Sequence, residues 1–463
     1  MTPSRDPIRS WLAPGPAVAL CATAFFLGGA DLVFGFRAFG VNVRYANLLL
    51  VLGLAAWLWR ERDGLAAHAR FLAIGWAPFI ALFSLSALVS PSPLPGLVKA
   101  AWFALNLVGA YAWCRLFRPA DLARGYFACY LVLAAILVTD FATGFIGGPQ
   151  AMIGHGQPNA LASGGTLWRP HAFHYEPSYA AAALALAWAL SVTRIGSQAP
   201  RLAVAVTGLG FVALVILMSR TGWLYVAVFV VLLPFAGAGS ARADRVRSLR
   251  HVGGAAAIAA VALAIALASP ANRERFTALV GPLGAGQTLE RICPLLDSVL
   301  PVLGLHCLEG EARRRALDDW NRDRKPVETS EGQRVKAAID AVEDIRRSVL
   351  LGNGVREGRT RLIEPVAANV WLEIGSEGGL LSLGAVLWGL GWSLWRGQAL
   401  APHNRAIALA LCAYFAVAWQ FLQTFPRLDQ WMSFWFALAM AAHAAAEPPQ
   451  RLQNISSKST SPS

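Results

Sequence analysis

Runs of apolar residues, separated by short polar breaks, dominate the pattern of this chain. A helix needs about 20 apolar residues to cross the hydrocarbon core of a bilayer, and most of these runs approach or reach that length. The pattern therefore predicts an all-α, polytopic membrane protein with about twelve transmembrane helices. The predicted spans are residues 17–36, 45–59, 71–90, 98–114, 125–146, 177–193, 202–218, 222–238, 252–269, 371–395, 406–424 and 430–446.

One long polar segment, residues 270–365, interrupts this series. Ser330 and Gln333 within it have the spacing of a capping box, and apolar residues then recur at helical spacing. We expect this helix to end at the turn Gly352-Asn353-Gly354, because Gly and Asn adopt the backbone conformation that stops a helix. The predicted organisation is nine helices in residues 1–269, a large helical loop in 270–365, three helices in 366–446 and a disordered tail in 447–463.

Composition and charge support a membrane protein and exclude a nucleic-acid partner. The 463 residues are 56% hydrophobic and only 14% charged, whereas about a quarter of a soluble domain is charged. The net charge is +13, but the basic residues punctuate the apolar runs as topology determinants do. Eighteen Lys and Arg lie in short segments on the side of the N-terminus and six on the other side. This bias predicts two cytoplasmic termini and an extracytoplasmic 270–365 loop.

The N-terminal run and the cysteines each have two interpretations. We interpret the N-terminal run as an uncleaved span rather than a signal peptide, because Asp31 and Arg37 follow it closely. Cys293 and Cys307 lie in the outside loop, where disulfides form, so they either pair or remain free thiols. No Cys or His spacing indicates a metal site. The other cysteines lie in or beside spans and are expected to be small buried apolar residues: Cys21, Cys114, Cys129 and Cys412.

A first polar cluster enters the sixth predicted span. It contains Arg169, His171, His174 and Glu176, and Pro177 follows at a favourable first position of a helix. The positive end of that helix would face outward, which suits phosphate, and Glu176 is a candidate general base. Alternatively, Glu176 only complements the dipole of its own helix.

Two basic groups lie further along the chain. Arg220 occupies the outside hairpin between the seventh and eighth spans, where it is either a phosphate ligand or an arginine that extends to lipid head groups. Arg334 and Lys336 begin the loop helix, where basic residues are often only solvated. All three lie on the predicted outer side.

A fourth cluster, residues 369–380, enters the tenth predicted span. Asn369 begins it, and Glu373 and Glu377 follow at i and i+4, so both acids face one side of a helix. Two acids within an apolar span are costly and suggest function. The glycines of this segment have a structural alternative, since small residues allow close packing of helices.

Several of these motifs follow one another as in a known family. Ser219-Arg220-Thr221-Gly222, Gly332-x-Arg334 leading to Leu351-Gly352-Asn353-Gly354-Val355, and Asn369-x-x-Leu372 with Glu377-x-Gly379 occur in the same order. Residues 160–440 thereby resemble the superfamily of O-antigen ligases and Wzy-type polysaccharide polymerases. The resemblance implies transfer of a glycan from undecaprenyl diphosphate, outside the bacterial inner membrane, without a cofactor or metal.

The resemblance also implies roles for individual residues. Arg220 would hold the donor diphosphate, and Arg334 would resemble the second phosphate-binding arginine. Ligases commonly have His-Asn where this chain has Ala368-Asn369, and Glu176-Pro177-Ser178 resembles exopolysaccharide polymerases, which favours a polymerase. We expect Glu176 to be the base, with His174 next and Glu373 or Glu377 third.

Two other functions remain as alternatives. One is a ligase that transfers the glycan to lipid A core or to protein. The other is a polysaccharide or lipid transporter or flippase without bond chemistry, although carriers usually place ionisable groups near the middle of the membrane. The expected partners are the lipid-linked glycan, membrane lipids, and a chain-length regulator and a flippase of the same pathway.

Overall fold

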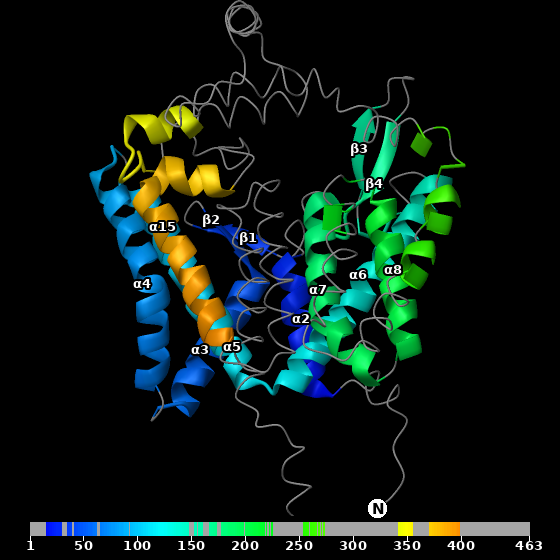
Figure 1. Ribbon diagram of the computed structural model, residues 1–463, viewed down its shortest axis with the longest axis horizontal. Helices are drawn as coiled ribbons and strands as arrows, with labels where there is room; N and C mark the ends of the chain where they lie inside the picture. The colour runs from blue at the N-terminus through cyan, green and yellow to red at the C-terminus, as the bar shows by residue number, and fades with distance from the viewer. Residues whose placement is uncertain are drawn as a thin grey trace, which may run out of the picture.

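In the computed structural model, the residues that the structure describes are mostly helical (Figure 1). Four helices of the described residues are long and apolar enough to cross a membrane: Leu65–Val89, Pro93–Leu116, Ala120–Gly144 and Val370–Ser393. A helical membrane protein is thereby confirmed, and the number of twelve spans stays a prediction. The structure describes residues 15–29, 35–38, 41–62, 65–91, 93–147, 152–154, 156–160, 166–173, 177–198, 200–217, 219, 222, 224–225, 253–258, 260–265, 267–268, 270, 272–273, 341–354 and 370–398.

The longer helices of these residues are α2 (Pro16–Gly29), α3 (Tyr45–Arg60), α4 (Leu65–Val89), α5 (Pro93–Leu116), α6 (Pro119–Gly147), α7 (Pro177–Gln198), α8 (Pro200–Ile216) and α15 (Val370–Gln398). Five of them begin at a proline. Proline suits the first position of a helix because the N–H that it lacks would have no partner there, and its fixed φ is already helical. Pro177 is one of these residues, as its position in the sequence predicts.

Several helices lie close to the predicted spans. Helices α3, α5 and α15 contain all or nearly all of the predicted runs 45–59, 98–114 and 371–395 and extend beyond them by a few residues. Of the runs 222–238 and 252–269, the structure describes only short helical pieces. The last two predicted spans lie outside the described residues.

Two β-hairpins differ from the purely helical prediction. Strands β1 (Gly35–Ala38) and β2 (Val41–Arg44) pair antiparallel, as do β3 (Gly156–Ala160) and β4 (Thr166–Pro170). The first span was predicted to reach residue 36, which is wrong, because α2 ends at Gly29. Each hairpin supplies hydrogen bonds to its own backbone, so these connections need no helical continuation.

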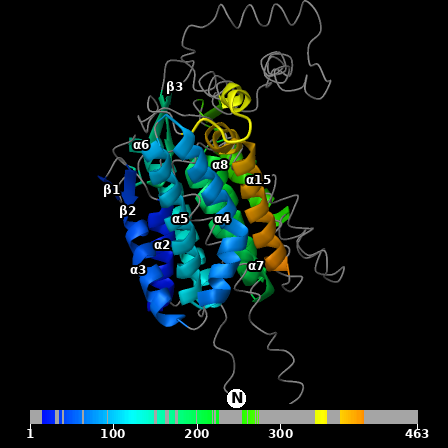
Figure 2. The ribbon, with the colours of Figure 1, turned by 90° about the vertical axis from the view of Figure 1, so that its left-hand side faces the viewer.

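The helices pack side by side, with α4 and α15 at the left of the bundle and α6 and α8 at the right in Figure 1, and with α4 toward the viewer in Figure 2. Helix α4 contacts both α5 and α15, and α5 also contacts α3. Helix α2 joins α3 to α6, and α7 and α8 pack on α6. Both hairpins lie toward the same end of the bundle (Figure 1).

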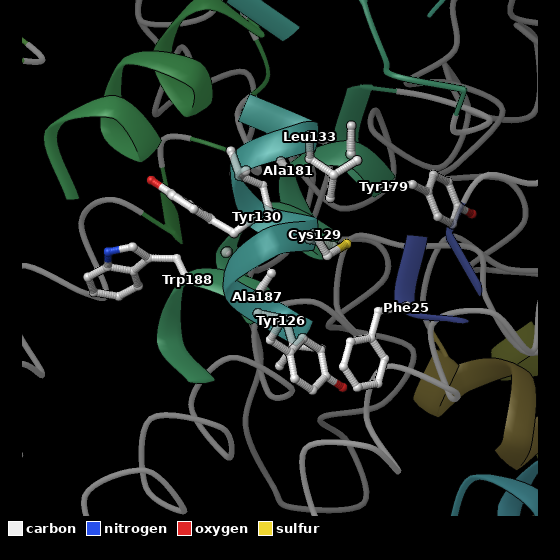
Figure 3. Packing of buried hydrophobic residues seen from close by; sticks show 14 of the residues in the cluster. Phe25, Tyr126, Cys129, Tyr130, Leu133, Tyr179, Ala181, Ala187 and Trp188 are labelled. Atoms are coloured by element: carbon white, nitrogen blue, oxygen red, sulfur yellow. The ribbon is translucent and has the colours of Figure 1, made fainter. Parts of the chain in front are cut away.

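The core beside α6 is built from aromatic and small side chains (Figure 3). The rings of Phe25 and Tyr126 stack with their centroids 3.6 Å apart, which joins α2 to α6. The Tyr130 hydroxyl donates a hydrogen bond to the Val206 carbonyl and so joins α6 to α8. The predicted burial of cysteines in the spans is confirmed for the described ones, which are buried free thiols: Cys21, Cys114 and Cys129.

Indole groups of α15 bind the backbone of α4. Pro78 lies inside α4 and has no N–H, so the carbonyl of Ile74, four residues earlier, lacks its usual helical donor. The Trp388 indole N–H donates to that carbonyl at 2.9 Å. Trp392 likewise donates to the Phe71 carbonyl at 3.2 Å. Helix α15 therefore satisfies a polar group that a proline would otherwise leave unpaired in an apolar environment.

Candidate functional site

The structure describes part of the predicted site. Arg169, His171, Glu373 and Glu377 lie within it, and so does the turn 352–354. The remaining candidates lie outside the described residues: His174, Glu176, Arg220, Arg334 and Asn369, together with Cys293 and Cys307. Two groups of described residues gather at the same end of the bundle, one at the beginning of α15 and one beside the hairpin β3–β4 (Figure 1).

A lysine joins the two predicted glutamates. Lys99 Nζ, in the second turn of α5, lies 2.5 Å from Glu377 Oε2 and 3.1 Å from Glu373 Oε1. Glu373 and Glu377 belong to the first two turns of α15 and are 1% and 5% exposed. As their i, i+4 spacing predicts, both carboxylates face the same partner. We call these three residues the Lys99 cluster.

The Lys99 cluster is a charged group inside an apolar helix bundle. An isolated buried carboxylate is very costly, and the cost falls only when an opposite charge and hydrogen bonds accompany it. The Lys99 side chain is 15% exposed and supplies both. The cluster therefore fixes the beginning of α15 against α5, and removal of Lys99 would leave two buried carboxylates without a counter-charge.

Helix α15 is interrupted directly after Glu377. Gly379 has φ 71° and ψ 178°, which no helical residue adopts. Backbone groups of residues 349–354 fill the interruption. Asn353 N and Gly354 N donate to the carbonyls of residues 376 and 377, and the N–H groups of residues 380 and 381 donate to those of 349 and 350. We call residues 349–354 and 376–381 together the α15 joint.

Glycines make this close contact possible. Gly352, Gly354 and Gly379 all have positive φ, which glycine adopts without steric cost. A β-carbon at Gly352 would lie 2.5 Å from the Glu377 carbonyl, and one at Gly379 would collide with the Leu350 carbonyl. The Glu377 carbonyl also accepts a hydrogen bond from Ser86 Oγ of α4 at 2.5 Å.

The segment before the joint is a short helix, residues 341–347, that belongs to the end of the long loop. Its predicted stop at Gly352-Asn353-Gly354 agrees with the structure, since the helix ends before these residues and both glycines have positive φ. Asn353 Nδ2 donates to the Asp344 carbonyl at 2.7 Å and closes the turn. Ile345 packs on Gly375, so the small residues of α15 also serve close packing, as the structural alternative held.

The second group surrounds Asp140 of α6, which is fully buried. Its two carboxylate oxygens accept hydrogen bonds from Ile153 N at 2.6 Å and Gly154 N at 2.9 Å. Phe173 N in turn donates to the Gly154 carbonyl at 2.7 Å. His171, which is buried, lies two residues before Phe173. Segment 152–154 therefore links α6 to the polar segment that leads into α7.

Arg169 lies in β4, opposite Gln157 of β3. Residues 166–173, which precede the sixth predicted span, thus form a strand and a turn. The two residues after His171 have left-handed backbone conformations, with φ 46° at Ala172 and φ 65° at Phe173. Residues other than glycine rarely adopt this region. Such conformations persist where surrounding contacts hold them and often occur at functional sites.

Sequence analysis did not select Lys99 or Asp140. Each is the only charged residue in its predicted run, 98–114 for Lys99 and 125–146 for Asp140. An ionisable residue inside a span suggests function by default, so this signal was available. Lys99 is instead one of the six basic residues of short segments that the charge bias assigns to the outer side.

The Lys99 cluster and the α15 joint together form a polar region near the beginnings of α5 and α15. One carboxylate oxygen of Glu373 and one of Glu377 face the Lys99 ammonium, so the cluster is suited to hold the helices α5 and α15 in place. No model of a known protein family matches this chain, and no curated protein matches it.

Proposed function

We propose that this protein is a multi-pass glycan polymerase of the bacterial inner membrane. It transfers glycan units from an undecaprenyl-diphosphate donor at the extracytoplasmic face. The family resemblance of the motifs leads to this proposal. The observation that supports it best is the α15 joint, because two motifs separated in the sequence, Gly352-Asn353-Gly354 and Glu377-x-Gly379, hydrogen-bond to each other there.

The proposed reaction needs cations on the leaving diphosphate and a base for the incoming sugar hydroxyl. Arg220 and Arg334 are proposed for the diphosphate, since arginine binds phosphate with two parallel hydrogen bonds. Glu176 is proposed as the base, with His174 as the second candidate. Contact with Lys99 disfavours Glu373 and Glu377 as bases, because the carboxylate oxygens that face it are already engaged.

The position of the Lys99 cluster favours an enzyme over a carrier. Transporters usually bind substrates and ions near the middle of the bilayer. Lys99 lies in the second turn of α5 and both glutamates lie in the first two turns of α15, so the charges lie near helix ends. A ligase that transfers glycan to lipid A core or protein remains the nearest alternative activity.

The direct test is purified protein in proteoliposomes with an undecaprenyl-diphosphate oligosaccharide. A ladder of longer glycans is expected. A single transfer to lipid A or protein would make the chain a ligase, and movement of donor across the bilayer without bond formation would make it a transporter. Either result would overturn the proposal that the protein is a polymerase.

Two variants test the proposed roles in the same assay. Arg220→Ala should abolish the ladder while the protein remains inserted and abundant. Glu176→Gln should lower turnover far more than donor binding. A full-length ladder from the first variant, or wild-type turnover from the second, would remove that residue from its role.

A further inference from the structure

Asp140 is a buried acid that the proposed reaction does not use. It lies in the apolar helix α6, yet its side chain is fully buried and both carboxylate oxygens accept backbone hydrogen bonds. A carboxylate in such an environment is kept only where hydrogen bonds compensate its burial. The two N–H groups belong to residues 153 and 154, which lie between α6 and β3 and not within α6 itself.

The hydrogen bonds continue from Asp140 to the turn that contains His171. Gly154 forms a backbone hydrogen bond with each of the two. Its N–H donates to Asp140 Oδ2 at 2.9 Å, and its carbonyl accepts from Phe173 N at 2.7 Å. A β-carbon at Gly154 would lie 2.7 Å from Asp140 Oδ2 and 2.8 Å from the Ala172 Cα. Gly154 therefore lies in direct contact with both the Asp140 carboxylate and the backbone of Ala172, and there is no room for a side chain at this position.

The turn held in this way is strained. Ala172 and Phe173 are both left-handed, at φ 46° and 65°, and neither is a glycine. The left-handed conformation brings Cβ close to the following carbonyl oxygen, so the free chain would avoid it. Phe173 also packs edge-on against Phe26 of α2, with ring centroids 6.3 Å apart. The hydrogen bond from Phe173 N to Gly154, which Asp140 in turn holds, and this aromatic contact help to offset the strain.

We propose that Asp140 is a positioning residue, which acts through Gly154 to hold the strained turn 171–173 and the buried His171 in one orientation. This inference rests on the proposed function in so far as it assigns the turn to glycan transfer. Asp140 itself does not contact the substrate. Its effect is preorganisation: a turn already held in its working conformation need not be ordered during the reaction.

Two variants separate positioning from simple stabilisation. Asp140→Asn keeps the shape of the side chain but replaces one acceptor with a donor that faces a backbone N–H. Ala172→Gly removes the strain without removing any hydrogen bond, because glycine adopts positive φ freely. Asp121→Asn is the matched control, since Asp121 is an acid in the first turn of the same helix.

Two readouts are measured on the full-length protein in detergent or proteoliposomes. Hydrogen–deuterium exchange should show peptides covering 152–154 and 171–173 exchanging at least tenfold faster in Asp140→Asn and unchanged in Asp121→Asn. Ala172→Gly should unfold at the same or a higher temperature than wild type. Asp140→Asn should lower kcat about tenfold, with KM for the lipid-linked donor within twofold of wild type, whereas Ala172→Gly, which keeps the hydrogen bonds, should lower kcat much less.

The outcomes distinguish this inference from the proposed function. Unchanged exchange in Asp140→Asn would overturn the positioning role whatever the activity. A loss of kcat in Ala172→Gly as large as that in Asp140→Asn would also overturn it, because the turn would then fail although its hydrogen bonds remain. An inactive wild-type protein would reject the proposed function, and the exchange measurement would still decide whether Asp140 holds the turn.

Discussion

Lys99 Nζ lies 2.5 Å from Glu377 Oε2, although 278 residues separate the two along the chain. This contact joins α5 to α15 directly before the interruption at Gly379. The carbonyl of the same glutamate accepts hydrogen bonds from Ser86 of α4 and from Gly354 of the loop segment. Glu377 of α15 is thus the residue at which α4, α5 and the end of the long loop meet.

Loss of the lysine should be strongly destabilising. Lys99→Met leaves two buried carboxylates without their ammonium, and breaking a buried ion pair costs about 3–5 kcal/mol. The apparent melting temperature in detergent should fall sharply. In the triple variant Lys99→Met, Glu373→Gln, Glu377→Gln, most of the loss should be recovered, because no charge is left uncompensated. Equal melting temperatures of Lys99→Met and wild type would show that the cluster contributes little.

The α15 joint makes a specific prediction about glycines. Gly354→Ala would force a left-handed alanine whose β-carbon collides with Ser90, so it should destabilise the protein by about 1–3 kcal/mol through backbone strain alone. Gly384→Ala is the matched control in α15, because a β-carbon there meets nothing within 4 Å. It should be neutral or stabilise α15 by up to about 1 kcal/mol, as alanine is the better helix former. Similar melting temperatures of the two variants would contradict the close packing described for the α15 joint.

The hydrogen bond between Trp388 and Ile74 predicts coupling to Pro78. Trp388→Phe should cost about 1 kcal/mol, since it leaves the Ile74 carbonyl without a donor. In a Pro78→Ala background, the alanine N–H can serve that carbonyl, so the same substitution should cost less. A double-mutant cycle of melting temperatures measures the difference. Additive effects would mean that Trp388 does not compensate for the proline.

The sequence predicted the apolar helices well and the polar connections poorly. Span length and hydropathy are local properties, so α3 was predicted to within one residue at its end. The hairpin β1–β2 was missed because the apolar run ending at residue 36 seemed continuous with α2. Its strands nevertheless alternate, with Phe36 and Ala38 separated by Arg37, a pattern of period two that favours a strand.

The site could be predicted only in part, for a physical reason. The shared face of Glu373 and Glu377 follows from helical spacing, which is local. Their contact with Lys99 depends on the packing of α4 between α5 and α15, which no local pattern specifies. Gly379 was interpreted as a packing residue, but a break in a membrane helix requires hydrogen-bonding partners from elsewhere, here residues 349 and 350.

The proposed function requires that the α15 joint and its loop segment lie on the extracytoplasmic side. The most direct measurement is labelling of single cysteines by a membrane-impermeant maleimide, in a variant without the native cysteines. Arg347→Cys tests the loop segment, since the Arg347 side chain is 59% exposed and forms a surface pair with Glu343. Arg60→Cys, at the end of α3, is the control for the cytoplasmic side; Arg60 is 61% exposed.

Position 347 should be labelled in intact spheroplasts, and position 60 should be labelled only after the membrane is permeabilised. Labelling of position 347 only after permeabilisation would place the joint in the cytoplasm and contradict the account.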